Sequence, residues 1–272
     1  MDFRDDDLSH YAAHGTPPLP APVRELHVDY AGASIWCGVY GEGAPVLLLH
    51  GAFNQSADWS RQIAALTEAG YCAIAIDNRG RGRSTLGTRP LSYALEAQEV
   101  FAVMDALDLP AASIVGWSDG SIIGLTMAMQ QPQRVSRVFA FGTVMHLDGL
   151  TPLDMDDPVL GRMFNRVKHD HARFSPEAER FEEIAQAVGR MTDTQPTYGD
   201  AELAAIRVPV AIVVGVRDEF VARGHTEHLA EVIPGAKLIA LPGGTHFALL
   251  QRPQEFNRAM LDYLGDSVIM SA

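Results

Sequence analysis

The sequence predicts an α/β protein, with a doubly wound, mostly parallel sheet and a helical cap inserted after the sixth strand. Short, wholly apolar runs alternate with stretches of helical periodicity, which is the pattern of parallel strands buried on both faces and joined by crossover helices. The chain has 272 residues, of which 47% are hydrophobic and 20% charged. This composition supplies a large core and excludes intrinsic disorder, so we expect one globular unit.

Residues 1–22 contain acidic residues and four prolines without either period, and they predict an extended N-terminal arm. The stretches 23–30 and 33–40 flank Ala31-Gly32 and predict a β-hairpin. Apolar runs predict further strands at 46–49, 72–76, 113–115, 138–141, 211–214 and 238–241. Helical periods predict helices at 59–68, 92–107, 119–131, 225–232 and 254–264.

Residues 145–200 break this alternation. They contain no strand-like run and include an acidic helical stretch at 176–190. We therefore expect a helical cap here, between the two parts of an α/β core at 23–144 and 201–272.

Charge and cysteine content exclude several classes of function. The chain has 21 Lys and Arg against 34 Asp and Glu, a formal charge of −13, which repels phosphate backbones and anionic lipids. We expect a small-molecule substrate, neither nucleic acid nor membrane as a partner, and a monomer or homodimer. Cys37 and Cys72 lie in apolar strand-like runs and predict free buried thiols. The acidic N-terminus lacks the features of a signal peptide, which favours a cytoplasmic location.

The strongest motif is Gly116-Trp117-Ser118-Asp119-Gly120, a G-x-S-x-G sequence between an apolar strand and an apolar helix. A sharp strand-to-helix turn in this place exposes a serine hydroxyl above the sheet, and small flanking residues let the backbone close tightly. The start of the following helix favours negative charge that develops on attack. Ser118 is therefore the predicted nucleophile.

A serine hydroxyl needs a base, and His246 is the candidate because it lies in a glycine-rich loop after the last predicted strand, at the edge where open α/β sheets bind ligands. Asp218 ends the preceding strand and is predicted to orient His246, with Glu219 and Asp148 as alternatives. The order serine, aspartate, histidine is the one expected for this arrangement.

Two backbone N–H groups are needed to stabilise an oxyanion. Asp119 supplies one as the residue after Ser118, and the loop after Leu49-His50-Gly51 supplies the other, from Ala52 or alternatively from Phe53. The side chains predicted to contact substrate are Phe53, Trp117, Met145, His146, Phe164 and Phe247.

Cofactor and metal motifs are weak. The pairs His169/His171 and His225/His228 have metal-compatible spacings but no third ligand nearby in the sequence. The glycine-rich, basic stretch 77–84 lacks the Lys-Ser/Thr pair of a phosphate loop and is interpreted as a structural turn that braces the site. We therefore expect neither a cofactor nor a metal.

From Val23 to its C-terminus the chain resembles the alpha/beta-hydrolase superfamily, through Leu49-His50-Gly51, residues 77–84, the serine motif, residues 215–218 and Gly244-Thr245-His246-Phe247. The sequence Gly-Trp-Ser-Asp-Gly is similar to the biphenyl-hydrolase-like (valacyclovir hydrolase) group. That resemblance implies that the carboxylate of Asp119 receives an amino group. The group usually has a second glycine where this chain has Ser121.

These observations predict a cofactor-independent serine hydrolase that cleaves a small ester, thioester or lactone, since a cap of this size encloses a modest volume. Two alternatives within the fold are a perhydrolase and a carbon–carbon bond hydrolase, for which Arg166 or Arg190 would bind the substrate carboxylate. A third alternative is a ligand-binding receptor that retains the catalytic residues without turnover.

Overall fold

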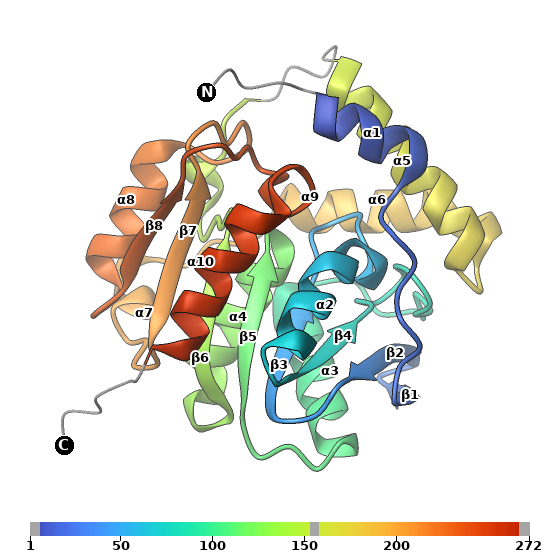
Figure 1. Cartoon of the computed structure of the whole chain (residues 1–272), viewed down its shortest axis with the longest axis horizontal. Helices are drawn as coiled ribbons and strands as arrows, with labels where there is room; N and C mark the ends of the chain where they lie inside the picture. The colour runs from blue at the N-terminus through green and yellow to red at the C-terminus, as the bar shows by residue number, and fades with distance from the viewer. Residues whose placement is uncertain (1–5, 153–157, 267–272) are drawn as a thin grey trace.

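The computed structural model describes residues 6–152 and 158–266 and is built around one eight-stranded sheet (Figure 1). The strand order is β1-β2-β4-β3-β5-β6-β7-β8. β2 is antiparallel to β1 and β4, and the other neighbouring pairs are parallel, so the predicted fold class is confirmed. The strands are β1 (Arg24–Tyr30), β2 (Ala33–Tyr40), β3 (Ala44–Leu49), β4 (Tyr71–Ile76), β5 (Ala112–Trp117), β6 (Val135–Phe141), β7 (Val210–Gly215) and β8 (Lys237–Leu241).

The two faces of the sheet are covered by different helices because strand side chains alternate. Val46 and Leu48 of β3 join one buried cluster, which also contains side chains of α2 and α10, while Leu47 and Leu49 join a second cluster with α3, α4 and α8. Figure 1 shows α2 and α10 in front of the sheet. These helices are α2 (Ser60–Glu68), α3 (Tyr93–Ala106), α4 (Asp119–Gln130), α8 (Arg223–Val232) and α10 (Pro253–Gly265), with the short α9 (Ala248–Gln251) before α10.

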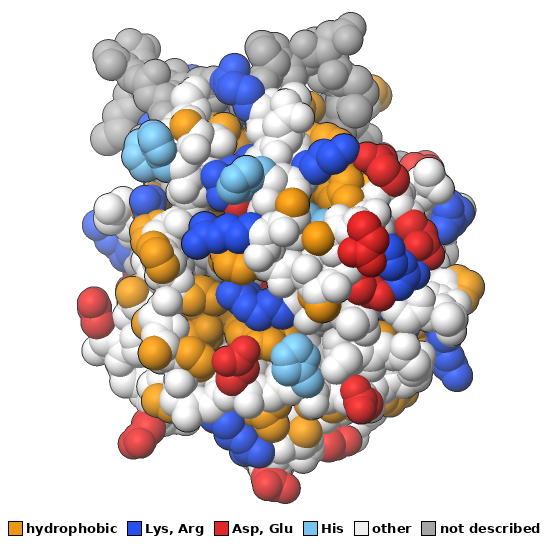
Figure 2. Space-filling model, turned by 90° about the vertical axis from the view of Figure 1, so that its right-hand side faces the viewer, with side chains coloured by type: hydrophobic (Ala, Val, Ile, Leu, Met, Phe, Trp, Pro, Cys, Tyr) orange, Lys and Arg blue, Asp and Glu red, His pale blue; other side chains and the backbone are white. Residues whose placement is uncertain are grey.

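The cap lies between β6 and β7. Its helices are α5 (Pro158–Phe174) and α6 (Phe181–Thr192), followed by the short α7 (Asp200–Leu203). The Tyr198 N–H donates to the Met145 carbonyl at 2.9 Å, which joins the end of the cap to its start. On the face shown in Figure 2, basic and acidic side chains are interspersed, and the cap helices are linked by the ion pair of Lys168 and Glu182 at 2.8 Å.

The prediction of an extended arm at residues 1–22 is wrong for residues 6–14, whereas residues 15–22 contain no helix or strand. Asp6–His14 form a helix, α1, which lies beside α5 (Figure 1). Leu8 and Tyr11 are buried, at 3% and 4% exposure, one turn apart on the same side of α1. A nine-residue helix is unstable alone, so it depends on packing against the cap, which a local pattern does not reveal.

The structure also describes the state of both cysteines and the length and polarity of the helices. Both cysteines are free, Cys37 being fully buried in β2 and Cys72 partly buried in β4. No helix in the described part of the chain is both long and apolar enough to cross a bilayer.

We predict that Gly120→Ala destabilises the fold, because a Cβ at this position would overlap the Leu49 carbonyl oxygen where α4 begins against β3. The expected cost is about 3 kcal/mol, from overpacking of a rigid contact. In the control Gly189→Ala, within α6, a Cβ meets nothing within 4 Å, and stability should hold or rise by about 1 kcal/mol. Urea unfolding midpoints measure both, and equal midpoints would contradict the close approach.

Candidate active site

Ser118 occupies a strained turn between β5 and α4. Its backbone has φ 53° and ψ −119°, a left-handed conformation that is unfavourable for a residue with a Cβ. The Ser118 N–H donates to the Phe141 carbonyl at 2.8 Å, and its own carbonyl accepts from the Ser121 N–H at 2.8 Å. A Cβ at Gly116 would approach the Gly120 carbonyl to 2.5 Å, so the small residues of the motif are required for the turn to close.

His246 is held by Asp218 through its ring. The two carboxylate oxygens of Asp218 lie 2.9 and 3.1 Å from Nδ1, and the His246 side chain is only 5% exposed. One Asp218 oxygen also accepts the backbone N–H groups of Phe220 and Val221, each at 2.9 Å. This carboxylate is therefore fixed by the backbone while it fixes the imidazole.

The alternatives to Asp218 have other partners. Glu219 accepts the backbone N–H of His246 at 3.0 Å, so it contacts the main chain of the histidine. Asp148 is exposed and pairs with His146 at 3.3 Å. Trp117 Nε1–H donates to the His246 carbonyl at 2.9 Å, which ties the loop of His246 to the residue before Ser118.

The pKa of the His246 imidazole is raised above its ordinary value. Burial lowers this pKa, but the negative charges of Asp218, Glu219 and Asp119 and the hydrogen bond that His246 donates to Asp218 outweigh burial. The arrangement therefore stabilises an imidazolium, the state that forms when histidine accepts a proton from a nucleophile.

His50 fixes the loop opposite Ser118. Its Nε2 accepts the Asn78 N–H at 3.0 Å, so the ring proton is on Nδ1, which donates to the Gly51 carbonyl at 2.7 Å. Burial, followed by the charge of Arg81, lowers the pKa of His50 to about 4. A Cβ built at Gly51 would lie 3.4 Å from the Ser118 Cβ, and this close approach brings the loop that carries Ala52 to the serine turn.

Asp119 begins α4, so its backbone N–H has no acceptor within the helix. The Asp119 side chain is buried, and one oxygen accepts the Tyr93 hydroxyl at 3.0 Å while the other has no hydrogen-bond partner. Burial, then the charge of Glu96, raises the pKa of Asp119 to about 6. Ser121, at the position where the resemblance leads one to expect glycine, donates its hydroxyl to the Ser118 carbonyl at 2.5 Å.

The stretch 77–84 braces this region with buried ion pairs. Arg81 pairs with Glu96 at 2.7 Å, and Arg79 pairs with Glu99. Asp77 accepts the N–H groups of Ser56 at 2.7 Å and of Arg83 at 2.8 Å. Sequence reasoning missed Glu96 and Glu99, since both lie on a predicted helix with nothing in the pattern to mark them as buried.

Ser118, Asp119, Ala52 and His246 line one cavity of about 670 Å³, larger than the modest enclosure predicted. Volumes of this order suit a drug-sized ligand. Four of the six predicted substrate-contacting side chains are in its wall: Phe53, Trp117, Phe164 and Phe247. The wall also includes Tyr93, Ile122, Val144, Leu150, Met163, Asp193 and Phe220, and its charged side chains among the described residues are acidic apart from His246.

Two predicted substrate contacts, Met145 and His146, are wrong. Met145 is fully buried in the core beside α6, because the chain turns inward after β6. His146 is part-exposed and pairs with Asp148, outside the residues that line the cavity. Arg166 pairs with Asp170 in α5, and Arg190 is exposed, so neither lines the cavity as the carbon–carbon hydrolase alternative requires.

The histidines with metal-like spacing have separate partners. His171 Nε2 lies 3.3 Å from the Glu177 carbonyl. His225 Nε2 accepts the Met145 N–H at 3.1 Å, and His228 pairs with Asp200 at 2.8 Å. Within residues 6–152 and 158–266, no three His, Cys, Asp or Glu side chains form a group that could hold a metal ion.

The fold and this arrangement of residues define an alpha/beta hydrolase, and the chain belongs to the alpha/beta hydrolase family, whose sequence profile matches residues 46–259. It is 29% identical over 254 residues to the putative carbamate hydrolase RutD of Variovorax paradoxus, covering 82% of this chain and 92% of that protein. Identity with the serine hydrolase BPHL of Mus musculus is 26% over 244 residues, covering 82% and 80%.

The fold is also similar to solved structures. One is described as Est816, an N-acyl homoserine lactone degrading enzyme, with a TM-score of 0.71 and 27% identity over 87% of this chain and 99% of that one. Family membership and these relatives together support a hydrolase.

We predict that His50 and His246, both buried, have pKa values displaced in opposite directions from the ordinary histidine pKa of about 6.5. His50 should stay neutral, with its proton on Nδ1, down to about pH 4. His246 should take up its proton above about pH 6.5, since its pKa is raised. Ring ¹⁵N resonances assigned with His50→Gln and His246→Gln measure both, and Asp218→Asn should lower the His246 value. A neutral His246 at pH 6 would show that the pKa of this imidazole is not raised.

Proposed function

We propose that this protein is a serine hydrolase that cleaves an ester, thioester or lactone through an acyl-enzyme intermediate. One observation carries the proposal: an Asp218–His246 pair and the strained Ser118 turn face the same cavity. The G-x-S-x-G position of Ser118 and the chain order serine, aspartate, histidine add support.

In the proposed reaction, Ser118 Oγ attacks the carbonyl carbon while His246 Nε2 accepts the hydroxyl proton. Asp218 on Nδ1 stabilises the imidazolium. The oxyanion accepts the N–H groups of Ala52 and Asp119. His246 then gives the proton to the leaving oxygen or sulfur, and the bond to the carbonyl carbon breaks. A water, deprotonated by His246, cleaves the acyl-enzyme, and Ser118 regains its proton.

The activities for which two relatives are named agree with this reaction class. The names carbamate hydrolase and homoserine lactone degrading enzyme both denote attack on a carbonyl carbon that bears a heteroatom leaving group. The same nucleophile, base and oxyanion donors serve each of these substrates, so the cavity wall is what selects among them.

The wall favours a neutral or cationic acyl group. Asp119 and Asp193 line the cavity, no described lining residue is Lys or Arg, and the chain carries a charge of −13. An anionic diketone acid, the substrate type of a carbon–carbon hydrolase, would lack a counter-charge here. The free oxygen of Asp119 supports an amino group on the acyl part of the substrate.

We predict that Ser118→Ala lowers kcat for p-nitrophenyl esters by at least ~10³ and abolishes fluorophosphonate labelling. Asp218→Asn should be similarly damaging, while Glu219→Gln keeps an acceptor for the His246 N–H and should retain most activity. Steady-state kinetics on folded variants measure this. Activity that survives in Asp218→Asn but not in Glu219→Gln would assign the role to the other carboxylate, and a wild type without multiple turnover would favour a receptor.

We also predict selection by charge. For esters of one alcohol, kcat/KM should be about tenfold higher for valine than for isovalerate, and about tenfold lower for hemisuccinate than for butyrate, as the Coulomb energy of a partly screened pair allows. Asp119→Asn should reduce the preference for valine while the backbone N–H at position 119 is kept. Equal values for valine and isovalerate would remove this part of the proposal.

A further inference from the structure

The N-terminal helix is attached to the core beside the loop that carries Ala52. Leu8 and Tyr11 of α1 are buried in the same cluster as Trp59. After the helix, Gly15 has φ 71° and lies against the Arg166 guanidinium of α5. The Thr16 hydroxyl donates to the Ala57 carbonyl at 2.8 Å. The segment therefore contacts the cap and the 3₁₀ turn Ser56–Trp59 at once.

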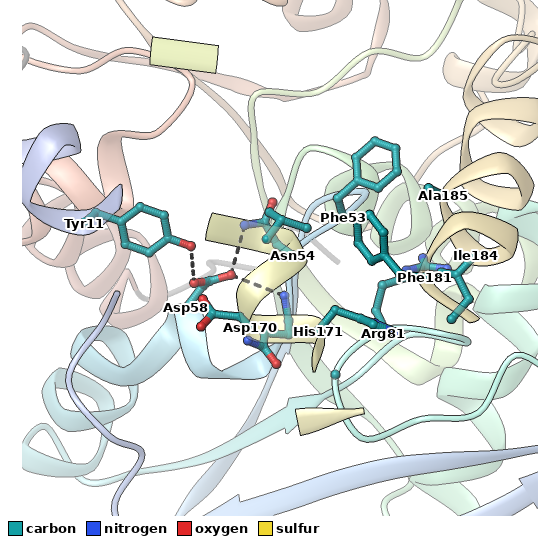
Figure 3. A pocket seen from close by; sticks show the side chains of 13 residues that line it. Tyr11, Phe53, Asn54, Asp58, Arg81, Asp170, His171, Phe181, Ile184 and Ala185 are labelled. Atoms are coloured by element: carbon teal, nitrogen blue, oxygen red, sulfur yellow. Dashed lines mark hydrogen bonds between the residues drawn. The ribbon is translucent and has the colours of Figure 1, made fainter. Parts of the chain in front are cut away.

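Asp58 receives donors from both sides of this junction (Figure 3). One oxygen accepts the Tyr11 hydroxyl at 2.8 Å, and the other accepts Asn54 Nδ2 at 2.9 Å and the Gln55 N–H at 3.3 Å. Asp58 is 3% exposed, and an unmet hydrogen bond at a buried carboxylate is costly.

Asn54 connects this cluster to the candidate active site. It lines the small cavity shown in Figure 3 and also the large cavity that contains Ser118. Its backbone N–H donates to the Gly51 carbonyl at 3.1 Å, closing the turn 51–54 around Ala52. The remaining residue of the turn, Phe53, packs on Phe164 of the cap with ring centroids 6.0 Å apart.

The Tyr11 hydroxyl also affects the charge of Asp58. Burial raises the pKa of Asp58 to about 6, and the hydrogen bonds from Asn54 and Tyr11 oppose that rise, whereas Asp170 of α5 adds to it. Without the Tyr11 donor the carboxyl shifts toward its neutral form. A neutral carboxyl is a weaker acceptor for Asn54 than a carboxylate.

We propose that Tyr11 is a positioning residue for the oxyanion loop: through Asp58 it fixes Asn54, and Asn54 fixes the turn that presents the Ala52 N–H. The inference rests on the proposed hydrolase function. A donor displaced by a fraction of an ångström stabilises a transition-state oxyanion less well, while substrate binding in the ground state is little changed.

The first test is Tyr11→Phe, which removes one hydroxyl and keeps the ring. We expect kcat for a p-nitrophenyl ester to fall about fivefold to tenfold with KM unchanged, since loss of one oxyanion-hole donor outright costs about 10² or more. Affinity for a trifluoromethyl ketone, which forms the oxyanion adduct, should fall by the same factor. The matched control is Tyr198→Phe, which removes a hydroxyl bonded to Thr126 at 3.0 Å and should leave kcat unchanged.

The second test is a double-mutant cycle with Asn54→Ala. If the effect of Tyr11 passes through Asn54, Tyr11→Phe should lower kcat in the wild-type background and have no further effect in Asn54→Ala. Additive losses, a change in KM alone, or an unchanged kcat in Tyr11→Phe would each overturn the inference.

Two readouts distinguish a failure of the Tyr11 positioning role from a failure of the proposed hydrolase function. Fluorophosphonate labelling that depends on Ser118, combined with an unchanged kcat in Tyr11→Phe, leaves the hydrolase and removes the positioning role. If Tyr11→Phe does not fold, Asp58→Asn replaces it, because an isosteric amide cannot accept from both Tyr11 and Asn54 on separate oxygens. Asp58→Asn should then lower kcat by the same factor and have no further effect in the Asn54→Ala background. A kcat for Asp58→Asn equal to that of the wild type would overturn the inference.

Discussion

The candidate site depends on one strained backbone position. Ser118 has a positive φ, and such a conformation persists only where its surroundings hold it. A hydrogen bond donated to β6 and another accepted from the first turn of α4 hold it here, and Gly116 and Gly120 leave the space that the turn needs. Because β5 and β6 are parallel neighbours in the centre of the sheet, the sheet restricts the movement of the Ser118 backbone.

Around Ser118, several buried charged side chains have an ion-pair or hydrogen-bond partner. Asp218 and Glu219 are adjacent in sequence and both contact His246. Asp218 accepts a hydrogen bond from the imidazole ring, and Glu219 accepts one from the main-chain N–H. The ion pairs Arg81–Glu96 and Arg79–Glu99 lie behind the site. Buried pairs of this kind are costly to break singly, so they keep the loop 77–84 and the His50 ring in one arrangement. Asp119 accepts the Tyr93 hydroxyl with one oxygen and has the other unpartnered, and it is adjacent to Ser118.

The cap and the N-terminal helix enclose the site from the opposite side. α5 provides Phe164 to the cavity and packs against α1, and α1 reaches the turn 51–54 through Tyr11 and Asp58. A helix about 100 residues before Ser118 in sequence is thus part of the structure that surrounds the turn 51–54. A hydrolase with a cavity of about 670 Å³ has room for an acyl group larger than acetate, and its acidic wall accounts for the charge preference that we propose.

The sequence by itself determined the fold class, the order of the strands along the chain and the places of Ser118 and His246 after strands, because alternating apolar runs and short motifs at strand ends are local signals. Tertiary structure alone decided that Asp6–His14 is helical, that Asp218 rather than Glu219 contacts the imidazole, and that Met145 faces the core. Each of these depends on which distant surface a side chain meets. A nine-residue segment, two adjacent carboxylates or a methionine after a strand carries no information about that surface.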